Sequence, residues 1–346
     1  MYHPRFKGNH YEMGKKMGLV LKKSNVHFPI ALDVFQKKFG TESTKIMKDL
    51  FPEIYEEIRG ITDQIEIDNN KFASWLMCMG CCLDLNENES TEIRGCTAFG
   101  FVCNNKVYYG RNNDLPPFLE PVSKSVYYQP EYGNKFILNT SAFVNGEEGM
   151  NEHGLAAAMT FVKPKINEIL PGINSVFIVR LILEKCKTVN EAILFIKKLP
   201  VASSCNILVI DKIGEMAVLE CHPQKINIRQ AEFNIQNNKY IIAVNHFISN
   251  SMRKYDAGNP KDFMSDIRFN IVERAMKSAD IYNPVEYLKN ILMGKYGLMC
   301  QYPKDMNFTT IWSSVINISN GEILRAEGHP LKKKYISDTR LKPVLP

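Results

Sequence analysis

The hydrophobic pattern of the chain changes from helical to strand-like periodicity near residue 93, and this change limits the folds open to it. In PEIYEEIRGITDQI (52–65), four isoleucines recur at spacings of four, three and four, which indicates one buried face of a helix. Beyond residue 93, apolar residues fall instead in short β-rich runs such as CTAFGFVC and KVYYGR. We therefore expect residues 1–92 to be helical and a first strand to begin at Cys96.

The rest of the chain alternates between groups of strands and pairs of helices. Strict alternation of single strands and helices is absent, so a doubly wound parallel sheet is disfavoured, and the order predicts an α+β fold of antiparallel sheets covered by helices. The predicted helices cover 70–85, two segments within 173–199, about 263–278 and 284–293. The predicted strands include SVYYQP, KFILNTSAF, SCNILVID, EMAVLEC, KINIRQ and YIIAVNHF. A last predicted hairpin pairs TTIWSSVINI with EILRA and is closed at Asn320-Gly321.

The amino-acid composition and charge argue against a membrane-spanning, secreted or nucleic-acid-binding protein. The chain has 346 residues, of which 45% are hydrophobic and 23% charged, as is typical of a globular protein. It contains no apolar run of the roughly 18 residues that cross a bilayer, and MYHPRFKGNHYEMGKK has no apolar signal region. The net charge of +6 is mild and spread along the chain. We expect a cytoplasmic protein that binds neither membranes nor nucleic acid.

The nine cysteines show no regular disulfide spacing. Cys78, Cys81 and Cys82 lie in the apolar run WLMCMGCCLDL, where a CxxC pair could bind metal or exchange disulfides. No second Cys/His pair with zinc spacing accompanies them, and there is no HExxH motif. We therefore expect buried structural thiols and no metal site.

The segment IRGCTAFGFVCNNKVYYGRNNDLPPF (93–118) places a Gly-Cys step at the head of a predicted hairpin. Taken alone, Cys96 would be a core thiol. However, the polar segment NENESTE (86–92) precedes it, and Gly95 offers an unhindered carbonyl to attack. Cleavage between Gly95 and Cys96 would create an α-amine, with an ordinary pKa of about 8, beside a thiol of about 8.5. One residue would then supply both nucleophile and base.

The pair GCTAF and GRNND resembles the N-terminal-nucleophile cysteine hydrolases, which include choloylglycine (bile-salt) hydrolases, penicillin V acylases and acyl-CoA:6-aminopenicillanate acyltransferase-like proteins. In these families the cysteine becomes the mature N-terminus, and the first hairpin returns an Arg and an Asp to it. The resemblance continues, in order, through MNEHGLAAAMTF (150–161), NILVIDKIGEMAVLE (206–220), AVNHF (243–247), SDIRFNIVERAM (265–276) and TIWSSVINISNGEI (310–323).

The 95 residues before the cysteine resemble the acyltransferase-like branch most closely, because NHYEMGKKMG and PEIYEEIRGI look like its helical pro-region. The resemblance implies a four-layer αββα sandwich. It also implies two parts: a pro-region of residues 1–95, retained as a small subunit after self-cleavage, and a catalytic domain of residues 96–346. One position departs from the pattern, since Arg111 is the residue expected in bile-salt hydrolases, whereas the aminopenicillanate acyltransferase itself differs there.

The resemblance also implies roles for residues around the nucleophile. Cys96 would attack during both self-cleavage and turnover. Arg111 would lie beside the thiol and favour the thiolate. Asp114 would accept a hydrogen bond from the new α-amine and hold it in place. Taken alone, Arg111 and Asp114 would be read as an ion pair at the end of a hairpin.

Three more residues take roles from the same resemblance. Asn245 would donate its side-chain amide to the oxyanion, and the backbone N–H near Thr160 would be the second donor. Arg268 would complete the charge network around the nucleophile. Without the resemblance, Asn245 would end a strand and Arg268 would lie on a solvated helix face. His246 offers a competing Cys–His dyad, which an N-terminal amine makes unnecessary.

Together these residues predict acyl transfer from a linear amide, through a Cys96 thioester, to water or to an amine. The expected partner is a small acyl amide, with acyl-CoA as an alternative co-substrate, and no cofactor is expected. Two alternatives stay open: an uncleaved relative that only binds acyl ligands, and a hydrolase of the bile-salt or penicillin V type. Homo-oligomerisation is also left open.

Overall fold

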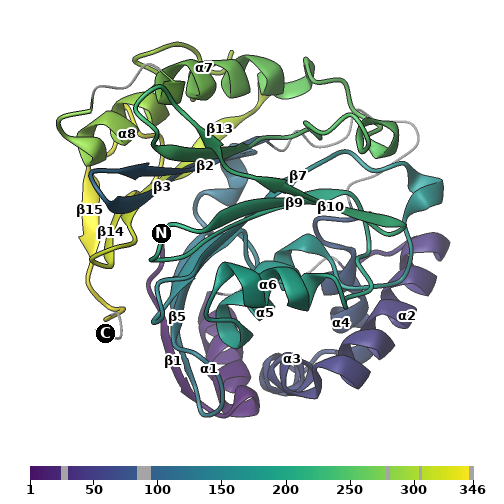
Figure 1. Ribbon diagram of the computed structural model, residues 1–346. Coiled ribbons are helices and arrows are strands. Elements are labelled where there is room, and N and C mark those ends of the chain that lie inside the picture. Colours follow the sequence, from purple (N-terminus) through teal and green to yellow (C-terminus); the bar gives the residue numbers. More distant parts are fainter. Residues whose placement is uncertain (25–29, 84–94, 278–280, 304–305, 343–346) are drawn as a thin grey trace.

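The protein folds into two stacked β-sheets with helices on both outer sides (Figure 1). The computed structural model describes residues 1–24, 30–83, 95–277, 281–303 and 306–342. The first sheet has the order β1-β4-β5-β6-β7-β8-β9-β10 and the second β11-β12-β2-β3-β13-β14-β15. The strands of the first sheet are β1 (Arg5–Gly8), β4 (Lys124–Pro130), β5 (Phe136–Thr140), β6 (Glu148–Asn151), β7 (Ala156–Phe161), β8 (Cys205–Ile210), β9 (Met216–His222) and β10 (Lys225–Gln230). Those of the second are β2 (Gly95–Cys103), β3 (Lys106–Leu115), β11 (Glu232–Phe233), β12 (Lys239–Ala243), β13 (Thr309–Asn317), β14 (Glu322–Ala326) and β15 (Tyr335–Asp338).

Three apolar clusters hold the layers together. One fills the space between the two sheets, and another joins the second sheet to helices α7 (Ser265–Lys277) and α8 (Pro284–Leu292). The largest packs the first sheet against the remaining helices. These are α1 (His10–Lys23), α2 (Val34–Leu50), α3 (Pro52–Ile65), α4 (Asn69–Cys78), α5 (Ser175–Lys185) and α6 (Val189–Ile196). The predicted α+β class with two sheets is confirmed.

The β2–β3 hairpin sets the geometry of the site. Its two turn residues, Asn104 and Asn105, have φ of 50° and 56°, the left-handed conformation that a two-residue turn of this kind requires and that asparagine tolerates. Counting back from this turn pairs Cys96 with Asn113 and Gly95 with Asp114. β2 lies between β12 and β3, inside the second sheet; β12 pairs with Ala98–Phe101, and the first residues of β2 pair with the end of β3.

The sequence pattern predicted a purely helical N-terminal segment, but the segment also contains a strand. Arg5–Gly8 forms β1, which pairs in parallel with β4 at the edge of the first sheet. The isoleucine face predicted for 52–65 is present in α3, where Ile54, Ile58 and Ile61 are fully buried. The helix predicted over 70–85 is shorter than expected, because α4 ends at Cys78 and Gly80 adopts a φ of 65°. The segment 86–92 lies outside the described residues.

The short strands β6, β11 and β15 were also missed, while the other predicted strands and helices are present within a few residues. All nine cysteines are buried, and none forms a disulfide. Across the described ranges, no helix is long and apolar enough to span a bilayer. Nor do the described side chains include three or more His, Cys, Asp or Glu grouped to hold a metal ion.

Candidate active site

Cys96 is the second residue of β2 and lines a large cavity. Its side chain is 3% exposed. Gly95, just before it, packs against the ring of Phe308, and a Cβ built on Gly95 would lie 2.6 Å from Phe308 Cζ. Only glycine therefore fits at this position without displacing the ring.

Arg111 and Asn113 lie on the same face of the hairpin as Cys96, because residues directly opposite or two apart in a sheet share a face. Arg111 Nη2 donates to Cys96 Sγ at 3.1 Å and to Asn113 Oδ1 at 2.6 Å, while Nη1 donates to the Met159 carbonyl at 2.6 Å. Burial raises the pKa of the Cys96 thiol, and the Arg111 charge opposes this effect. The guanidinium therefore lies where it would stabilise a thiolate.

Asn113 was not among the residues singled out from the sequence, although it lies within GRNND. The Cys96 thiol donates to its Oδ1 at 3.3 Å. Its Nδ2 is fully buried and has no hydrogen-bond acceptor among the described residues. The hairpin register could have revealed this residue, since a two-residue turn at Asn104-Asn105 places position 113 opposite Cys96.

Asp114 lies on the opposite face of the hairpin from the Cys96 side chain. Its carboxylate accepts from Tyr302 Oη at 2.8 Å and from Thr310 Oγ1 at 2.5 Å. Burial raises the pKa of Asp114, and the Arg268 charge opposes this effect. Asp114 thus flanks the start of β2, but in the intact chain the Cys96 backbone nitrogen donates to a different side chain.

That side chain is Asn245, just after the end of β12. Asn245 Oδ1 accepts from the Cys96 N–H at 2.8 Å and from Arg268 Nη2 at 2.7 Å. Asn245 Nδ2 donates to the Phe161 carbonyl at 2.9 Å. The structure therefore brings Asn245 to the nucleophile, with its amide oxygen toward the Cys96 nitrogen.

Arg268 extends from α7 into the same site and is fully buried. Its Nη1 donates to the Cys96 carbonyl at 2.6 Å and to Thr97 Oγ1 at 2.7 Å. Arg268 is therefore not a solvated helix residue: it holds the backbone of β2 at Cys96 and fixes Asn245 beside it.

Thr160 supports the site from a distance. Its Oγ1 donates to the Val244 carbonyl at 2.6 Å and accepts from Asn206 Nδ2 at 3.2 Å. These bonds tie β7 and β8 to the residue before Asn245. The side-chain contacts of Thr160 therefore reach the Asn245 segment and not Cys96.

His246 does not form a dyad with Cys96. Its Nδ1 pairs with Ser265 Oγ at 2.8 Å. Burial, and then the nearby Arg268 charge, lower the pKa of His246 to about 4. The imidazole is therefore neutral over the physiological pH range.

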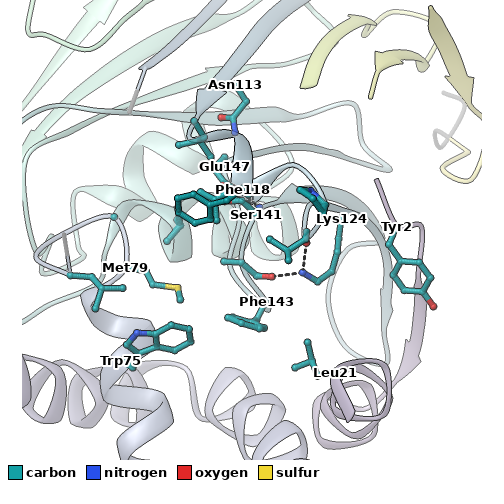
Figure 2. A pocket seen from close by; sticks show the side chains of 18 of the residues that line it. Tyr2, Leu21, Trp75, Met79, Asn113, Phe118, Lys124, Ser141, Phe143 and Glu147 are labelled. Carbon is teal, nitrogen blue, oxygen red and sulfur yellow. Dashed lines mark hydrogen bonds between the residues drawn. The ribbon is translucent and has the colours of Figure 1, made fainter. Parts of the chain in front are cut away.

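The cavity beside Cys96 has a volume of about 1230 Å³ and a mainly apolar wall (Figure 2). Cys96, Asn113 and Met159 line one part of it. Leu21, Trp75 and Met79, from the N-terminal helices and the residue after α4, line another part, as do Phe118 and Phe143, which follow β3 and β5. Residues before and after Cys96 in the sequence therefore form one cavity together.

Most of the chain matches a known protein family. The family model described as acyl-coenzyme A:6-aminopenicillanic acid acyl-transferase matches residues 103–332, more than half of the chain. The chain belongs to this family. The matched range begins after Cys96 and includes Arg111, Asp114, Asn245 and Arg268.

Solved structures similar to this chain include a penicillin V acylase from Agrobacterium tumefaciens (16% identity, 71% of this chain and 87% of that chain covered, TM-score 0.45). Another is the Caenorhabditis elegans orthologue of N-acylethanolamine-hydrolyzing acid amidase (15% identity, 65% and 93% covered, TM-score 0.46). A third is a mutant of conjugated bile acid hydrolase from Clostridium perfringens (12% identity, 72% and 98% covered, TM-score 0.39). A search of curated protein sequences finds no match.

Proposed function

We propose that this member of the acyltransferase family cleaves itself between Gly95 and Cys96 and then transfers acyl groups from linear amides through a thioester on Cys96. The observation that carries the proposal is the placement of Cys96: its sulfur contacts Arg111, its backbone nitrogen contacts Asn245, and its side chain borders a large apolar cavity. A reactive cysteine needs a nearby cation, a base and a substrate space.

Self-cleavage would supply the base. In the intact chain the Cys96 nitrogen is an amide and cannot accept a proton, and burial raises the pKa of the thiol. Cleavage would convert that nitrogen into an α-amine beside Sγ, with Asn245 Oδ1 already positioned to hold it and the Asp114 carboxylate nearby to orient it.

In turnover, the thiol would give its proton to the α-amine while Sγ attacks the substrate carbonyl carbon. The resulting ammonium would return the proton to the leaving nitrogen as the carbon–nitrogen bond breaks, leaving a Cys96 thioester. Water or a second amine would then attack the thioester and release the thiol. Arg111 would favour the thiolate, and Arg268 would hold the β2 backbone in place.

The cavity supports an apolar acyl group as the bound part of the substrate, because most of its lining side chains are apolar. Residues 1–95 line it together with the rest of the chain, so they would act as a retained small subunit and residues 96–346 as the large one. Dissociation of residues 1–95 would remove Leu21, Trp75 and Met79 from the cavity wall and expose the cavity to solvent.

The experiment begins with the intact mass of the purified protein. We expect two fragments divided at Gly95–Cys96 for the wild type and a single species for Cys96→Ala. Cys103→Ala is the matched control, because Cys103 is a buried cysteine at the other end of the same strand, and this variant should still cleave. Two fragments cut at this bond in Cys96→Ala would exclude an intramolecular mechanism.

A panel of N-acyl amides then tests turnover. Brief mixing with a substrate should give an acyl adduct on Cys96 by mass spectrometry, and turnover that survives Cys96→Ala would exclude Cys96 as the nucleophile. The second candidate is an acyl-binding protein without catalysis, favoured by the buried, neutral thiol of the intact chain. It predicts a wild type that remains uncleaved and binds acyl amides without an adduct.

A further inference from the structure

A buried lysine interrupts the apolar wall of the cavity. Lys124, the first residue of β4, lines the cavity and is only 6% exposed. Figure 2 shows its side chain beside Ser141 and Phe143, with dashed lines from its nitrogen to neighbouring oxygens. A lysine this buried is uncommon in proteins unless its charge is paired.

The Lys124 ammonium has no ionic partner within the described part of the chain. Nζ donates to the backbone carbonyls of Val122 at 2.7 Å and Ala142 at 2.8 Å, and it lies 5.5 Å from the centre of the Phe143 ring. An ammonium has three N–H donors. The third donor of Lys124 meets no acceptor among the described residues, and none of their carboxylates lies within ion-pair distance.

Glu147 is the acidic group in the same wall, and its carboxylate is bound elsewhere. It accepts hydrogen bonds from the backbone N–H and the hydroxyl of Ser141. Burial lowers the pKa of Lys124 to about 8, and the Glu147 charge opposes this effect only in part. Lys124 is therefore mostly protonated near pH 7, and its charge is only partly compensated by the protein.

We propose that Lys124 binds an anionic group of the substrate, so that the acyl amide this cavity accepts carries a carboxylate joined to an apolar chain. The proposal rests on the proposed function for the position of the reacting amide and adds the substrate class. A carboxylate in the cavity would accept from the unused N–H and compensate the buried charge, a charge-assisted bond that is stronger than a neutral one.

The carboxylate could come from either side of the amide, and matched ligands separate the two sources. One set carries it at the far end of the acyl chain, with a neutral amine part. The second set carries it on the amine part, as in an N-acyl amino acid, with a methyl-ended acyl chain. The reference set is neutral at both ends, and each set spans acyl chains of several lengths.

Binding is measured by calorimetry in the Cys96→Ala protein, which does not depend on self-cleavage or turnover. The ligand affinities can therefore still be measured and compared if the protein proves not to cleave itself or not to turn over amides. We expect one carboxylate set to bind about 10-fold or more tightly than the neutral set. Lys124→Met should abolish this preference without weakening binding of the neutral set, and Lys124→Arg should retain most of it.

A purely structural role for Lys124, tying the loops of Val122 and Ala142, predicts a different result. Lys124→Met would then lower stability and weaken all three ligand sets alike. Lys124→Gln retains a donor for the carbonyls without the charge, and it replaces the Met variant if that variant does not fold. Two results would overturn the proposal. One is equal affinity of the Cys96→Ala protein, which retains Lys124, for neutral and carboxylate ligands; the other is a preference for carboxylate ligands that is unchanged in Lys124→Gln.

A second inference comes from the unpartnered amide of Asn113. Arg111 and the Cys96 thiol both donate to Oδ1, which fixes the orientation of the amide and leaves Nδ2 as the free donor within the described part of the chain. Asn113 borders the cavity, and Figure 2 shows its amide end turned toward it. The Nδ2 of Asn245, by contrast, already donates to the Phe161 carbonyl.

The geometry points to Asn113 Nδ2 as a donor to the substrate carbonyl oxygen while that oxygen becomes an oxyanion. Loss of one such donor slows acyl transfer by about 10²–10³. Asn113→Asp is the deciding variant, because it keeps an acceptor for Arg111 and removes the donor. Asn112→Ala is the matched control, since the Asn112 side chain donates to the Leu292 carbonyl on the opposite face.

The first measurement is the rate of single-turnover acylation of Cys96. The second is the affinity of an aliphatic aldehyde that forms a hemithioacetal with Cys96 Sγ. We expect Asn113→Asp and Asn113→Ala to lose acylation rate and aldehyde affinity alike, and Asn112→Ala to retain both where it is folded. If Asn113 only positions Arg111, Asn113→Asp will keep the wild-type acylation rate and aldehyde affinity, although Asn113→Ala loses them. That outcome would overturn the inference.

Discussion

The backbone nitrogen of Cys96 donates to Oδ1 of Asn245 at 2.8 Å, a contact between residues 149 positions apart. It fixes the start of β2 from the neighbouring strand β12, and Arg268 from α7 braces the same Asn245 oxygen at 2.7 Å. The nitrogen that would become the catalytic amine is therefore already held before any cleavage takes place.

The first prediction concerns this contact. Asn245→Ala removes the acceptor for the Cys96 nitrogen and for Arg268. Because the catalytic amine would then be left unpositioned as a base, we expect turnover to fall by about 10² or more. Asn245→Asp is the matched variant because it retains an acceptor at the same place. Its rate, measured on cleaved protein, should lie above that of Asn245→Ala. A rate within a few-fold of wild type in Asn245→Ala would contradict the proposed role.

The second prediction concerns the space at Gly95. A methyl group there would lie 2.6 Å from Phe308 Cζ, so Gly95→Ala should displace the ring and slow self-cleavage. Overpacking of this kind destabilises a fold by about 1–3 kcal/mol. Chemical denaturation and a time course of intact mass measure the two effects. Adding Phe308→Leu, which removes the contacting ring atoms, should restore both; unchanged stability and cleavage in Gly95→Ala alone would show that the contact is unimportant.

The third prediction concerns how residues 1–95 stay attached. Arg180 on α5 is fully buried and binds Glu57 of α3 at 3.0 Å and Glu184 at 2.7 Å, while His10 of α1 contacts Glu184 at 2.9 Å. Breaking such a buried cluster costs about 3–5 kcal/mol. We expect the cleaved fragments of the wild type to co-purify and those of Arg180→Met to dissociate at lower denaturant concentrations.

The control for this prediction is Arg180→Met combined with Glu57→Gln and Glu184→Gln, which removes the unpaired charges and should recover part of the stability. Native separation of the small wild-type fragment, leaving a folded large fragment, would refute retention. The apolar cluster shared by α1–α6 and the first sheet gives a further reason to expect that the fragments remain together.

The fourth prediction concerns pH. Because the pKa of His246 is lowered to about 4, its imidazole is neutral above that pH and does not change charge between pH 5 and 8. His246→Gln should therefore leave the shape of the pH–rate profile unchanged over this range. Disappearance of a titration near pH 6 in this variant would restore the Cys–His dyad as the mechanism.

Local sequence patterns predicted much of this molecule because they depend on short-range geometry. The spacing of Ile54, Ile58 and Ile61 defines a buried helix face whatever it packs against. The paired asparagines at 104–105 suit the two-residue turn of the predicted hairpin; the place of Arg111 beside the thiol was expected from the family resemblance, and the register set by this turn agrees with it. These predictions needed no knowledge of distant contacts.

Tertiary structure decided which polar groups meet. The sequence pattern had no means of showing that Arg5–Gly8 would pair with β4, because a short edge strand has little periodicity of its own and forms only when a partner edge is available. Nor did it show that Asn245 turns its oxygen to Cys96 or that Lys124 faces an apolar cavity. Those arrangements depend on packing between layers that are far apart in the chain, and only the assembled sheets bring them together.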